Sequence, residues 1–223
     1  MKNNSSENIQ KLIDFSSEIG IPIGFEDAEK LVIYMNYILD RNQHINLTAI
    51  MDDEEFIKKH LIDSMIISKL PEFTKSEAVI DIGTGAGFPG IPLAVLAKEK
   101  RFLLVDSLLK RIKVVNEGID LLQLNNVSAV HARGENLSLS HPFENGADLV
   151  IARAVANMSK LAKYTLPNVK MSGFLVALKG PSIEEELQEA KETIKKLGGE
   201  MIRVQDLSFG ELKHNAVICK KIR

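Results

Sequence analysis

The sequence predicts an α/β fold: a mostly parallel β-sheet with helices on both faces, a terminal antiparallel pair of strands and a helical N-terminal extension. Three observations predict it. Short and almost wholly apolar runs recur from residue 77 onward. Amphipathic segments with helical spacing separate these runs. Strands this apolar, alternating with helices, are typical of a parallel sheet that is buried on both faces.

The first 71 residues are predicted to form the helical extension, and residues 72–223 the main α/β domain. Apolar residues recur at helical spacing over 31–39 and again over 57–66. The acidic run at 52–55 stands at the start of the second helix, where the helix dipole favours negative charge. We expect this extension to pack on the main domain and to make some contact with the substrate.

Seven apolar runs in the main domain are predicted to be strands, with helices between the first five. The clearest helical patterns cover 108–122 and 183–197, and Gly198-Gly199 closes the second one. The last two strands are joined by a short loop, which predicts an antiparallel pair. The predicted strands cover 78–81, 102–106, 127–130, 147–151, 173–178, 201–207 and 215–221.

Composition and charge exclude several classes of protein. Of the 223 residues, 45% are hydrophobic and 26% charged, which is ordinary for a soluble globular protein. No apolar run approaches the roughly 18 residues of a membrane span, and the polar N-terminus lacks the core of a signal peptide. One cysteine, Cys219, fits a reducing compartment, so we expect a cytoplasmic protein. The net charge of −2 means that any nucleic-acid surface must be local.

The strongest functional signal is the segment 79–90, VIDIGTGAGFPG. It joins the first predicted strand to a helix that begins near Ile91-Pro92. Glycines let the backbone approach a ligand that lies across the strand end. The helix N-terminus offers free amide groups to an anionic part of that ligand. The segment therefore predicts a nucleotide-type cofactor.

Two cofactors compete for this glycine loop. Gly85, Gly87 and Gly90 fit the dinucleotide pattern GxGxxG, which is a weak signal alone. Asp81, two residues before Gly83, would be unfavourable beside a pyrophosphate. The same carboxylate suits the ammonium and sulfonium cations of S-adenosyl-L-methionine. The DxGxGxG arrangement therefore favours adenosylmethionine, with these residues at the cofactor.

Asp106 ends the second predicted strand, 23 residues beyond Gly83. A carboxylate at this position can accept hydrogen bonds from both ribose hydroxyls of a nucleotide. The alternative is that Asp106 only caps the following helix. Two carboxylates at successive strand ends, Asp81 and Asp106, favour the ligand site, although Asp106 does not separate the two cofactors.

Three later strand ends add candidate residues. Gly134 and Glu135 follow the third strand, where an adenine ring would lie; a loop with a helix-starting glutamate is the alternative. Arg153 ends the fourth strand between two alanines and faces the ligand crevice, unless it is an ordinary surface arginine. Lys179 ends the fifth strand, where a solvated lysine at a turn is equally compatible.

Basic and metal-binding patterns are weaker. Lys110, Arg111 and Lys113 place three cations in the first turn of a predicted helix, against its dipole. They are candidate contacts for an anionic partner such as a nucleic acid, although exposed lysines are common on any surface. The five histidines show no HxxxH or HExxH spacing and there is no cysteine cluster, so we predict no metal.

Together these segments resemble the bacterial 16S rRNA (guanine-N7) methyltransferase family, also called glucose-inhibited division protein B. The resemblance covers roughly residues 36 to 181, most of the chain, and its combination of motifs is far more specific than the glycine loop. The segments that carry it are 81–90, 105–111 and 151–156, with 46–50 and 60–64 upstream and 177–180 downstream.

The resemblance implies a class I methyltransferase (Rossmann-like) fold and S-adenosyl-L-methionine as cofactor. It implies one guanine of 16S rRNA as target, in the free RNA or in a small-subunit particle, and we expect no membrane partner and a monomer. Position 134 is often alanine in this family, and the glycine here leaves a backbone contact to adenine possible. Asp106 matches the usual ribose acceptor, and the positions matching cofactor contacts are Gly83, Phe88, Gly134, Glu135 and Arg153.

The upstream motif residues Asn46 and His60 are characteristic of the family and are candidate RNA contacts. Guanine N7 has an in-plane lone pair and loses no proton on methylation. We therefore expect in-line displacement without an obligatory general base, with Arg153 and Lys179 in positioning roles. An arginine that forks across both O6 and N7 would block the reacting atom, so any arginine contact must leave N7 free.

Three other functions remain open from the sequence. A methyltransferase of the same fold acting on a small molecule or protein would have the same cofactor residues. An NAD-dependent oxidoreductase is disfavoured by Asp81. A non-catalytic binding module is disfavoured by the intact glycine loop and both strand-end carboxylates.

Overall fold

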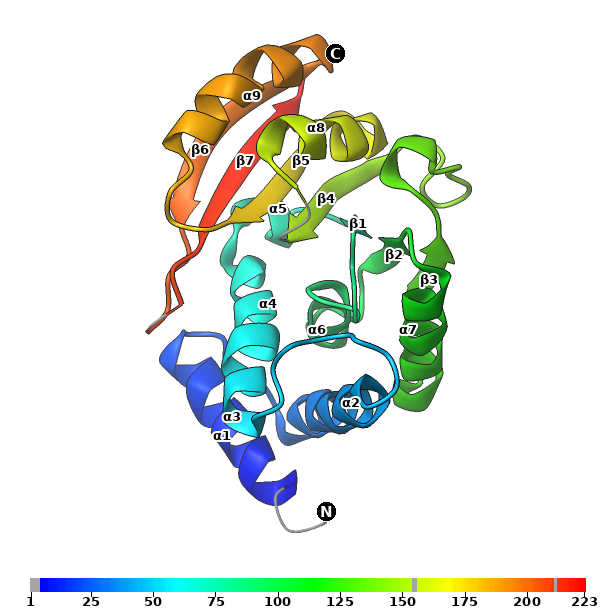
Figure 1. The fold of residues 1–223 in the computed structure, drawn as a ribbon, viewed down its shortest axis with the longest axis vertical. Helices are drawn as coiled ribbons and strands as arrows, with labels where there is room; N and C mark the ends of the chain where they lie inside the picture. The colour runs from blue at the N-terminus through cyan, green and yellow to red at the C-terminus, as the bar shows by residue number, and fades with distance from the viewer. Residues whose placement is uncertain (1–4, 154–155, 211) are drawn as a thin grey trace.

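The computed structural model describes residues 5–153, 156–210 and 212–223. In this part of the chain, strands pair into one sheet with the order β3-β2-β1-β4-β5-β7-β6 (Figure 1). Neighbours from β3 to β5 run parallel, while β7 is antiparallel to both β5 and β6. The predicted sheet, with its antiparallel C-terminal pair, is confirmed. The strands are β1 (Ala78–Ile82), β2 (Arg101–Asp106), β3 (Val127–His131), β4 (Ala147–Arg153), β5 (Val169–Lys179), β6 (Gly199–Asp206) and β7 (Asn215–Lys221).

Helices cover both faces of this sheet and divide its core into two layers. The N-terminal helices, α6 and α7 pack on one face, and α8 and α9 pack on the other (Figure 1). The helices are α1 (Ser5–Glu18), α2 (Phe25–Asn42), α3 (Asp53–Phe56), the π-helix η1 (Ile57–Ile62), α4 (Asp63–Met65), the 3₁₀ helix η2 (Ile66–Lys69), α5 (Pro71–Thr74), α6 (Gly90–Leu96), α7 (Leu109–Leu122), η3 (Gly134–Asn136), α8 (Met158–Thr165), η4 (Leu166–Asn168) and α9 (Glu184–Lys196).

Side-chain alternation in β1 shows why the strands are apolar on both faces. Val79 belongs to the core layer beneath the N-terminal helices, whereas Ile80 and Ile82 belong to the layer beneath α8 and α9. Successive side chains of a strand point to opposite faces, so a strand covered on both sides must be apolar throughout. Asp81 is the polar exception in this strand and is fully buried.

Two elements differ from the sequence prediction. Strand β5 begins at Val169, four residues before the predicted start, because 170–172 are exposed and Met171 alone does not extend the apolar run. The predicted helix over 57–66 is divided into the π-helix η1, α4 and η2. Apolar periodicity does not distinguish these helix types, since their turns differ by less than one residue.

Helix α2 holds the glycine loop through one side chain, Tyr34. Its ring is fully buried, and its hydroxyl donates a hydrogen bond to the Ala86 carbonyl at 2.9 Å. A Cβ at Gly87, where φ is +85°, would lie 2.4 Å from the tyrosine hydroxyl. A Cβ at Gly118 in α7 would also lie 2.4 Å from the ring. The two glycines therefore make room for the ring between the loop and α7.

Candidate cofactor and substrate site

A cavity of about 330 Å³ lies at the carboxyl ends of β1, β2 and β3, beside α8. Its volume lies within the range of small-molecule sites. Ligands of open parallel sheets bind at this edge, because the loops after the strands meet there. The lining residues are Ile82, Gly83, Val105, Asp106, Ser107, Ala132, Arg133, Gly134, Glu135, Lys160 and Tyr164.

Asp106 is placed as the sequence predicts, at the end of β2 on the wall of this cavity. Its Oδ2 accepts a hydrogen bond from the Gly85 amide at 3.0 Å, and its Oδ1 accepts one from the Leu108 amide at 2.8 Å. Arg111 Nη1 lies 3.4 Å from Oδ2. A carboxylate has about four lone-pair positions. The two amides therefore orient Asp106, and two hydroxyl groups in the cavity would take its remaining position and, in place of the long Arg111 contact, a second one.

The buried side chain of Asp81 holds the two ends of the glycine loop through hydrogen bonds. Its Oδ2 accepts hydrogen bonds from the Thr84 hydroxyl at 2.7 Å and from the Gly90 amide at 2.9 Å. Its Oδ1 is buried and has no hydrogen-bond partner among the described residues. Burial raises the pKa of Asp81 to about 6, although the Thr84 and Gly90 hydrogen bonds lower it. A nearby cation would satisfy this carboxylate, so the donor set fits a positively charged cofactor.

The raised pKa of Asp81 predicts a loss of ligand-free stability on going from acid to neutral pH. The folded-state pKa of about 6 exceeds the ordinary 3.8, so folding favours the protonated form. The stabilisation is therefore present below the unfolded-state pKa and is lost as pH rises through 6. Asp81→Asn keeps an acceptor oxygen and does not titrate. Between pH 5 and 7.5, the free energy of unfolding of wild type should fall by ~1–2 kcal/mol relative to that of this variant.

Urea unfolding of both ligand-free proteins at the two pH values measures this difference, with other titrating groups common to both. If wild type and variant differ in free energy of unfolding by the same amount at both pH values, the burial of an uncompensated carboxyl group at position 81 is contradicted.

Gly134 and Glu135 also lie where the sequence places them, on the cavity wall after β3. Gly134 is buried, and a Cβ there would lie 2.7 Å from the Tyr164 carbonyl oxygen and 3.0 Å from Ile82. Asn168 donates to the Gly134 carbonyl at 2.8 Å. An alanine at this position would require α8 to shift, so glycine permits the close packing of η3 on α8. Glu135 is exposed at the cavity mouth.

Phe88 is buried on the other side of the glycine loop, among side chains of the N-terminal helices. Its ring stacks on His60, with centroids 4.8 Å apart and planes inclined by 9°. It also makes edge contacts with Phe56 and Tyr34. Phe88 is not among the described residues that line the cavity, so its predicted cofactor contact stays a prediction.

Arg153, at the end of β4, lies next to Phe88 and points toward the π-helix. Its Nη1 donates to Asp63 Oδ2 at 2.9 Å and to the Lys59 carbonyl at 3.2 Å. Its Nη2 lies 3.2 Å from His60 Nδ1. His60 and Arg153, which are far apart in the sequence, are thus brought together, while Asn46 is exposed on the preceding loop.

Lys179 and the basic cluster have different environments. Lys179 Nζ donates to Glu186 Oε1 at 2.6 Å and to the Ala156 carbonyl, which ties the chain after β4 to α9. In α7, Lys110 and Lys113 are exposed, whereas Arg111 is directed toward Asp106. The roles predicted for these residues stay predictions.

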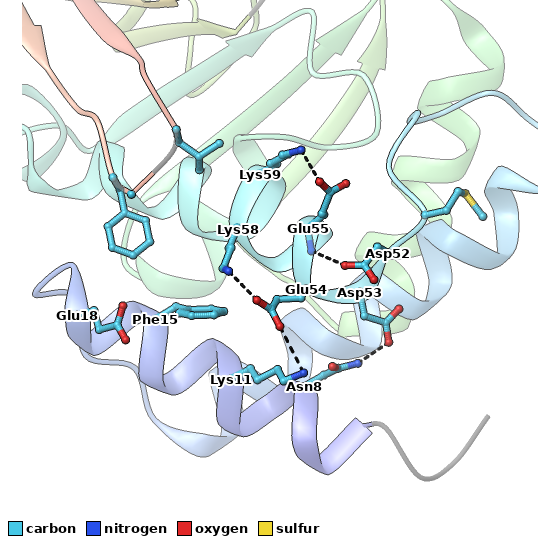
Figure 2. A pocket seen from close by; sticks show the side chains of 14 residues that line it. Asn8, Lys11, Phe15, Glu18, Asp52, Asp53, Glu54, Glu55, Lys58 and Lys59 are labelled. Atoms are coloured by element: carbon cyan, nitrogen blue, oxygen red, sulfur yellow. Dashed lines mark hydrogen bonds and ion pairs between the residues drawn. The ribbon is translucent and has the colours of Figure 1, made fainter.

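A larger cavity, of about 920 Å³, lies away from the strand ends, between α1, α3, the π-helix and the loop after β6. Figure 2 shows its ion pairs: Lys58 contacts Glu54, Lys59 contacts Glu55, and Lys11 contacts Glu54. None of the glycine loop lines it. The smaller cavity is lined by four of the residues marked in the sequence, Gly83, Asp106, Gly134 and Glu135, and the larger one by none of them.

Several residues of these sites were not among the candidates from the sequence. Lys160 and Tyr164 line the cavity from α8, and no sequence pattern marks them. Asp63 lies within the 60–64 motif but was not selected. His214, just before β7, contacts Asp63 Oδ1 and carries no local signal.

Two searches of the described ranges, 5–153, 156–210 and 212–223, have negative results. These residues contain no group of three or more His, Cys, Asp or Glu side chains arranged to hold a metal ion. Within the same ranges, each helix is too short or too polar to cross a membrane.

The family model and the relatives that match this chain are all described as rRNA small subunit methyltransferases G. The family described as GidB, rRNA small subunit methyltransferase G, matches residues 27–215. The chain is 42% identical over 210 residues to the ribosomal RNA small subunit methyltransferase G of Clostridium botulinum, covering 93% of this chain and 88% of that protein.

Solved structures confirm the predicted methyltransferase fold. TYW2 of M. jannaschii, solved in complex with AdoMet, matches with a TM-score of 0.56 and 24% identity, over 77% of each chain. The O-methyltransferase of a Brevibacillus brevis trans-AT PKS multienzyme, solved with S-adenosyl-L-homocysteine, matches with a TM-score of 0.56 and 13% identity. That match covers 86% of this chain and 79% of the other.

Proposed function

The chain belongs to the rRNA small subunit methyltransferase G family, and from this premise we propose that it methylates N7 of one guanine in 16S rRNA, using S-adenosyl-L-methionine. The observation that carries the proposal is the cavity at the strand ends that Gly83, Asp106, Gly134 and Glu135 line together. The family match includes every residue of this cavity.

Four residues are proposed to hold the cofactor. Asp106 would accept the ribose hydroxyls, while Gly134 and Glu135 would flank the adenine ring. Asp81 is fully buried beneath the glycine loop and does not line the cavity, so its charge would act on the cationic end from behind the loop. The bound cofactor supplies an electrophilic methyl group. The remaining task of the protein is to position the guanine. Correct positioning can lower the activation free energy by roughly 7–11 kcal/mol.

The proposed displacement requires no general base, since guanine N7 loses no proton. The environment of His60 supports this. Burial and the charge of Arg153 lower its pKa to about 4, so at neutral pH the ring is a weak base. Arg153 Nη2 also lies 3.2 Å from its Nδ1. We propose that Arg153 contacts an oxygen of the cofactor or the guanine nucleotide and leaves N7 accessible.

The RNA is proposed to approach over the start of α7, beside the cofactor cavity. Lys110 and Lys113 are exposed there, and the neighbouring Leu108 and Leu109 are 42% and 50% exposed. Lysines attract phosphates, and apolar side chains can contact unstacked bases. The target guanine must leave its stack to enter a cavity, so junctions and loops are better substrates than regular duplex.

Methyl transfer from labelled adenosylmethionine tests the proposal. Small subunits that lack the modification, and rRNA stripped of protein, should be offered separately, followed by nucleoside analysis. We expect label in 7-methylguanosine of 16S rRNA. Label in another nucleoside, or in neither substrate despite cofactor binding, would overturn the assignment. A rate that rises steeply with pH near neutrality would count against the mechanism without a base.

A further inference from the structure

Asp63 is the buried centre of a polar cluster that joins three distant parts of the chain. The residue is 4% exposed and begins α4. Arg153 of β4 donates to one carboxylate oxygen at 2.9 Å, and His214 contacts the other. Burial alone would raise the pKa of Asp63, but the His214 hydrogen bond and the Arg153 charge outweigh it and lower the pKa. Asp63 is therefore an ionised group with both oxygens engaged.

The direction of the hydrogen bonds in this cluster fixes the tautomer of His60. A guanidinium only donates, so His60 Nδ1 must accept from Arg153 Nη2, 3.2 Å away. The ring hydrogen then lies on Nε2 and donates to the Thr48 hydroxyl oxygen at 2.7 Å. Stacking on Phe88 holds the ring plane. His60 is thus fixed as a neutral acceptor that faces Arg153.

The guanidinium of Arg153 uses only part of its hydrogen-bonding capacity within the protein. It has five N–H donors. Three of them reach Asp63 Oδ2, the Lys59 carbonyl and His60 Nδ1. For the remaining two, Nε–H and one Nη2–H, the described residues provide no acceptor. The side chain is 16% exposed, so these donors remain available to a bound molecule.

A second arginine–carboxylate pair, in which Glu72 is buried and the Arg203 side chain is 36% exposed, shows that this arrangement is unusual. Arg203 forks onto both oxygens of Glu72, at 2.8 and 2.9 Å, which is the simplest way to hold an ion pair. Arg153 instead distributes three donors over three acceptors. All three acceptors come from the π-helix and the residue that follows it. Local π-helical turns are frequent at functional sites.

We propose that Asp63 and His60 are positioning residues that hold the Arg153 guanidinium in one plane, with its two remaining donors directed at an oxygen of the bound substrates. The inference rests on the proposed function for the identity of those substrates. The oxygen belongs either to the carboxylate of adenosylmethionine or to the guanine nucleotide. Without Asp63 and His60, the long side chain of Arg153 would rotate among several conformations and lose this orientation.

A double-mutant cycle tests the proposal, with Asp63→Asn, Arg153→Gln and the double variant. Asparagine keeps the shape of Asp63, and glutamine keeps a donor for it. The readouts are the Kd of adenosylmethionine by calorimetry, and kcat and KM for unmodified small subunits. We expect Arg153→Gln to impair at least one of these by about 10-fold or more, and Asp63→Asn to impair the same one similarly. In the Arg153→Gln background, Asp63→Asn should add less than about twofold.

The quantity that changes distinguishes the two sources of the oxygen. A weaker Kd assigns the contact to the cofactor, and a raised KM or lowered kcat at unchanged Kd assigns it to the guanine nucleotide. His60→Leu provides a second route if Asp63→Asn does not fold, and it should show the same non-additivity. Glu72→Gln is the control, because it breaks an ion pair of a buried carboxylate away from the cavity and should lower stability while leaving Kd, kcat and KM unchanged.

Two results would overturn the inference. One is that Asp63→Asn and His60→Leu each change Kd, kcat or KM as much in the Arg153→Gln background as they do in wild type. The other is the absence of any effect of Arg153→Gln on all three quantities. Failure of the proposed function is recognised separately, since wild type would then bind adenosylmethionine without methylating the RNA. In that case, the effect of the variants on the Kd of adenosylmethionine is the one remaining test of the inference.

Discussion

Replacing Asp106 with alanine should weaken adenosylmethionine binding by about 100-fold or more. The variant removes the proposed acceptor of both ribose hydroxyls, and each hydrogen bond to a charged group contributes roughly 1.5–3 kcal/mol. Every 1.4 kcal/mol corresponds to about tenfold in Kd. The variant also releases the Gly85 amide, which now donates to Asp106 at 3.0 Å, and so loosens the glycine loop. Calorimetric titration with adenosylmethionine measures the change.

Asp148 offers a matched control for this experiment at the other end of the sheet. Its carboxylate accepts hydrogen bonds from the Glu77 and Ala78 amides at 2.9 and 2.8 Å, much as Asp106 accepts from two loop amides. Asp148→Ala should therefore lower stability without changing the Kd of adenosylmethionine. If the Asp106 and Asp148 variants bind adenosylmethionine with equal Kd, Asp106 only orients the backbone and does not contact the cofactor.

Tyr34→Ala should lower the free energy of unfolding by about 3–5 kcal/mol, the usual loss for a fully buried aromatic side chain. The ring fills the space between Gly87 and Gly118, and neither glycine has a side chain that could replace it. A loss of this size is a large part of the stability of an ordinary domain. Urea unfolding of wild type and variant measures it.

Tyr34→Phe separates packing from the hydrogen bond to the glycine loop. It keeps the ring but leaves the buried Ala86 carbonyl without its donor, at a cost of roughly 1–3 kcal/mol. We expect weaker cofactor binding because the loop is held less firmly. Tyr37→Phe, one helical turn later, removes a hydroxyl that contacts Glu117 and the Val114 carbonyl of α7 rather than the glycine loop, and should leave cofactor binding unchanged. A Tyr34→Phe variant with wild-type stability and affinity would disprove this role of α2.

Local features of the sequence were sufficient to predict the sheet and to mark residues that line the cavity at its strand ends. Strand β1 and the loop after it are encoded by adjacent residues, an apolar run followed by closely spaced glycines. Asp106 and Gly134 were predicted for the same reason, since each lies directly at a strand end. Parallel strands place their carboxyl ends at one edge, so position in the chain determines position in the site.

Other assignments needed more than local patterns. Periodicity over 57–66 predicted a helix but not the π-helical turn within it. Phe88 adjoins the glycine loop in sequence, yet its ring packs on His60 in the core beneath the N-terminal helices. The division of the chain at residue 72 stays a prediction, and Tyr34 shows that side chains from both parts share one core layer.

The sequence by itself determined the order of strands and helices, the glycine loop, the strand-end carboxylates and the choice of adenosylmethionine over a dinucleotide. These depend on residues that are neighbours in the chain. Only the tertiary structure brought Arg153 to His60 and Asp63, and His214 to Asp63, across separations of 93, 90 and 151 residues. Such contacts depend on how the N-terminal helices and the C-terminal strands pack on the sheet. Burial then decides which polar groups must pair, because an unpaired charge is costly away from water.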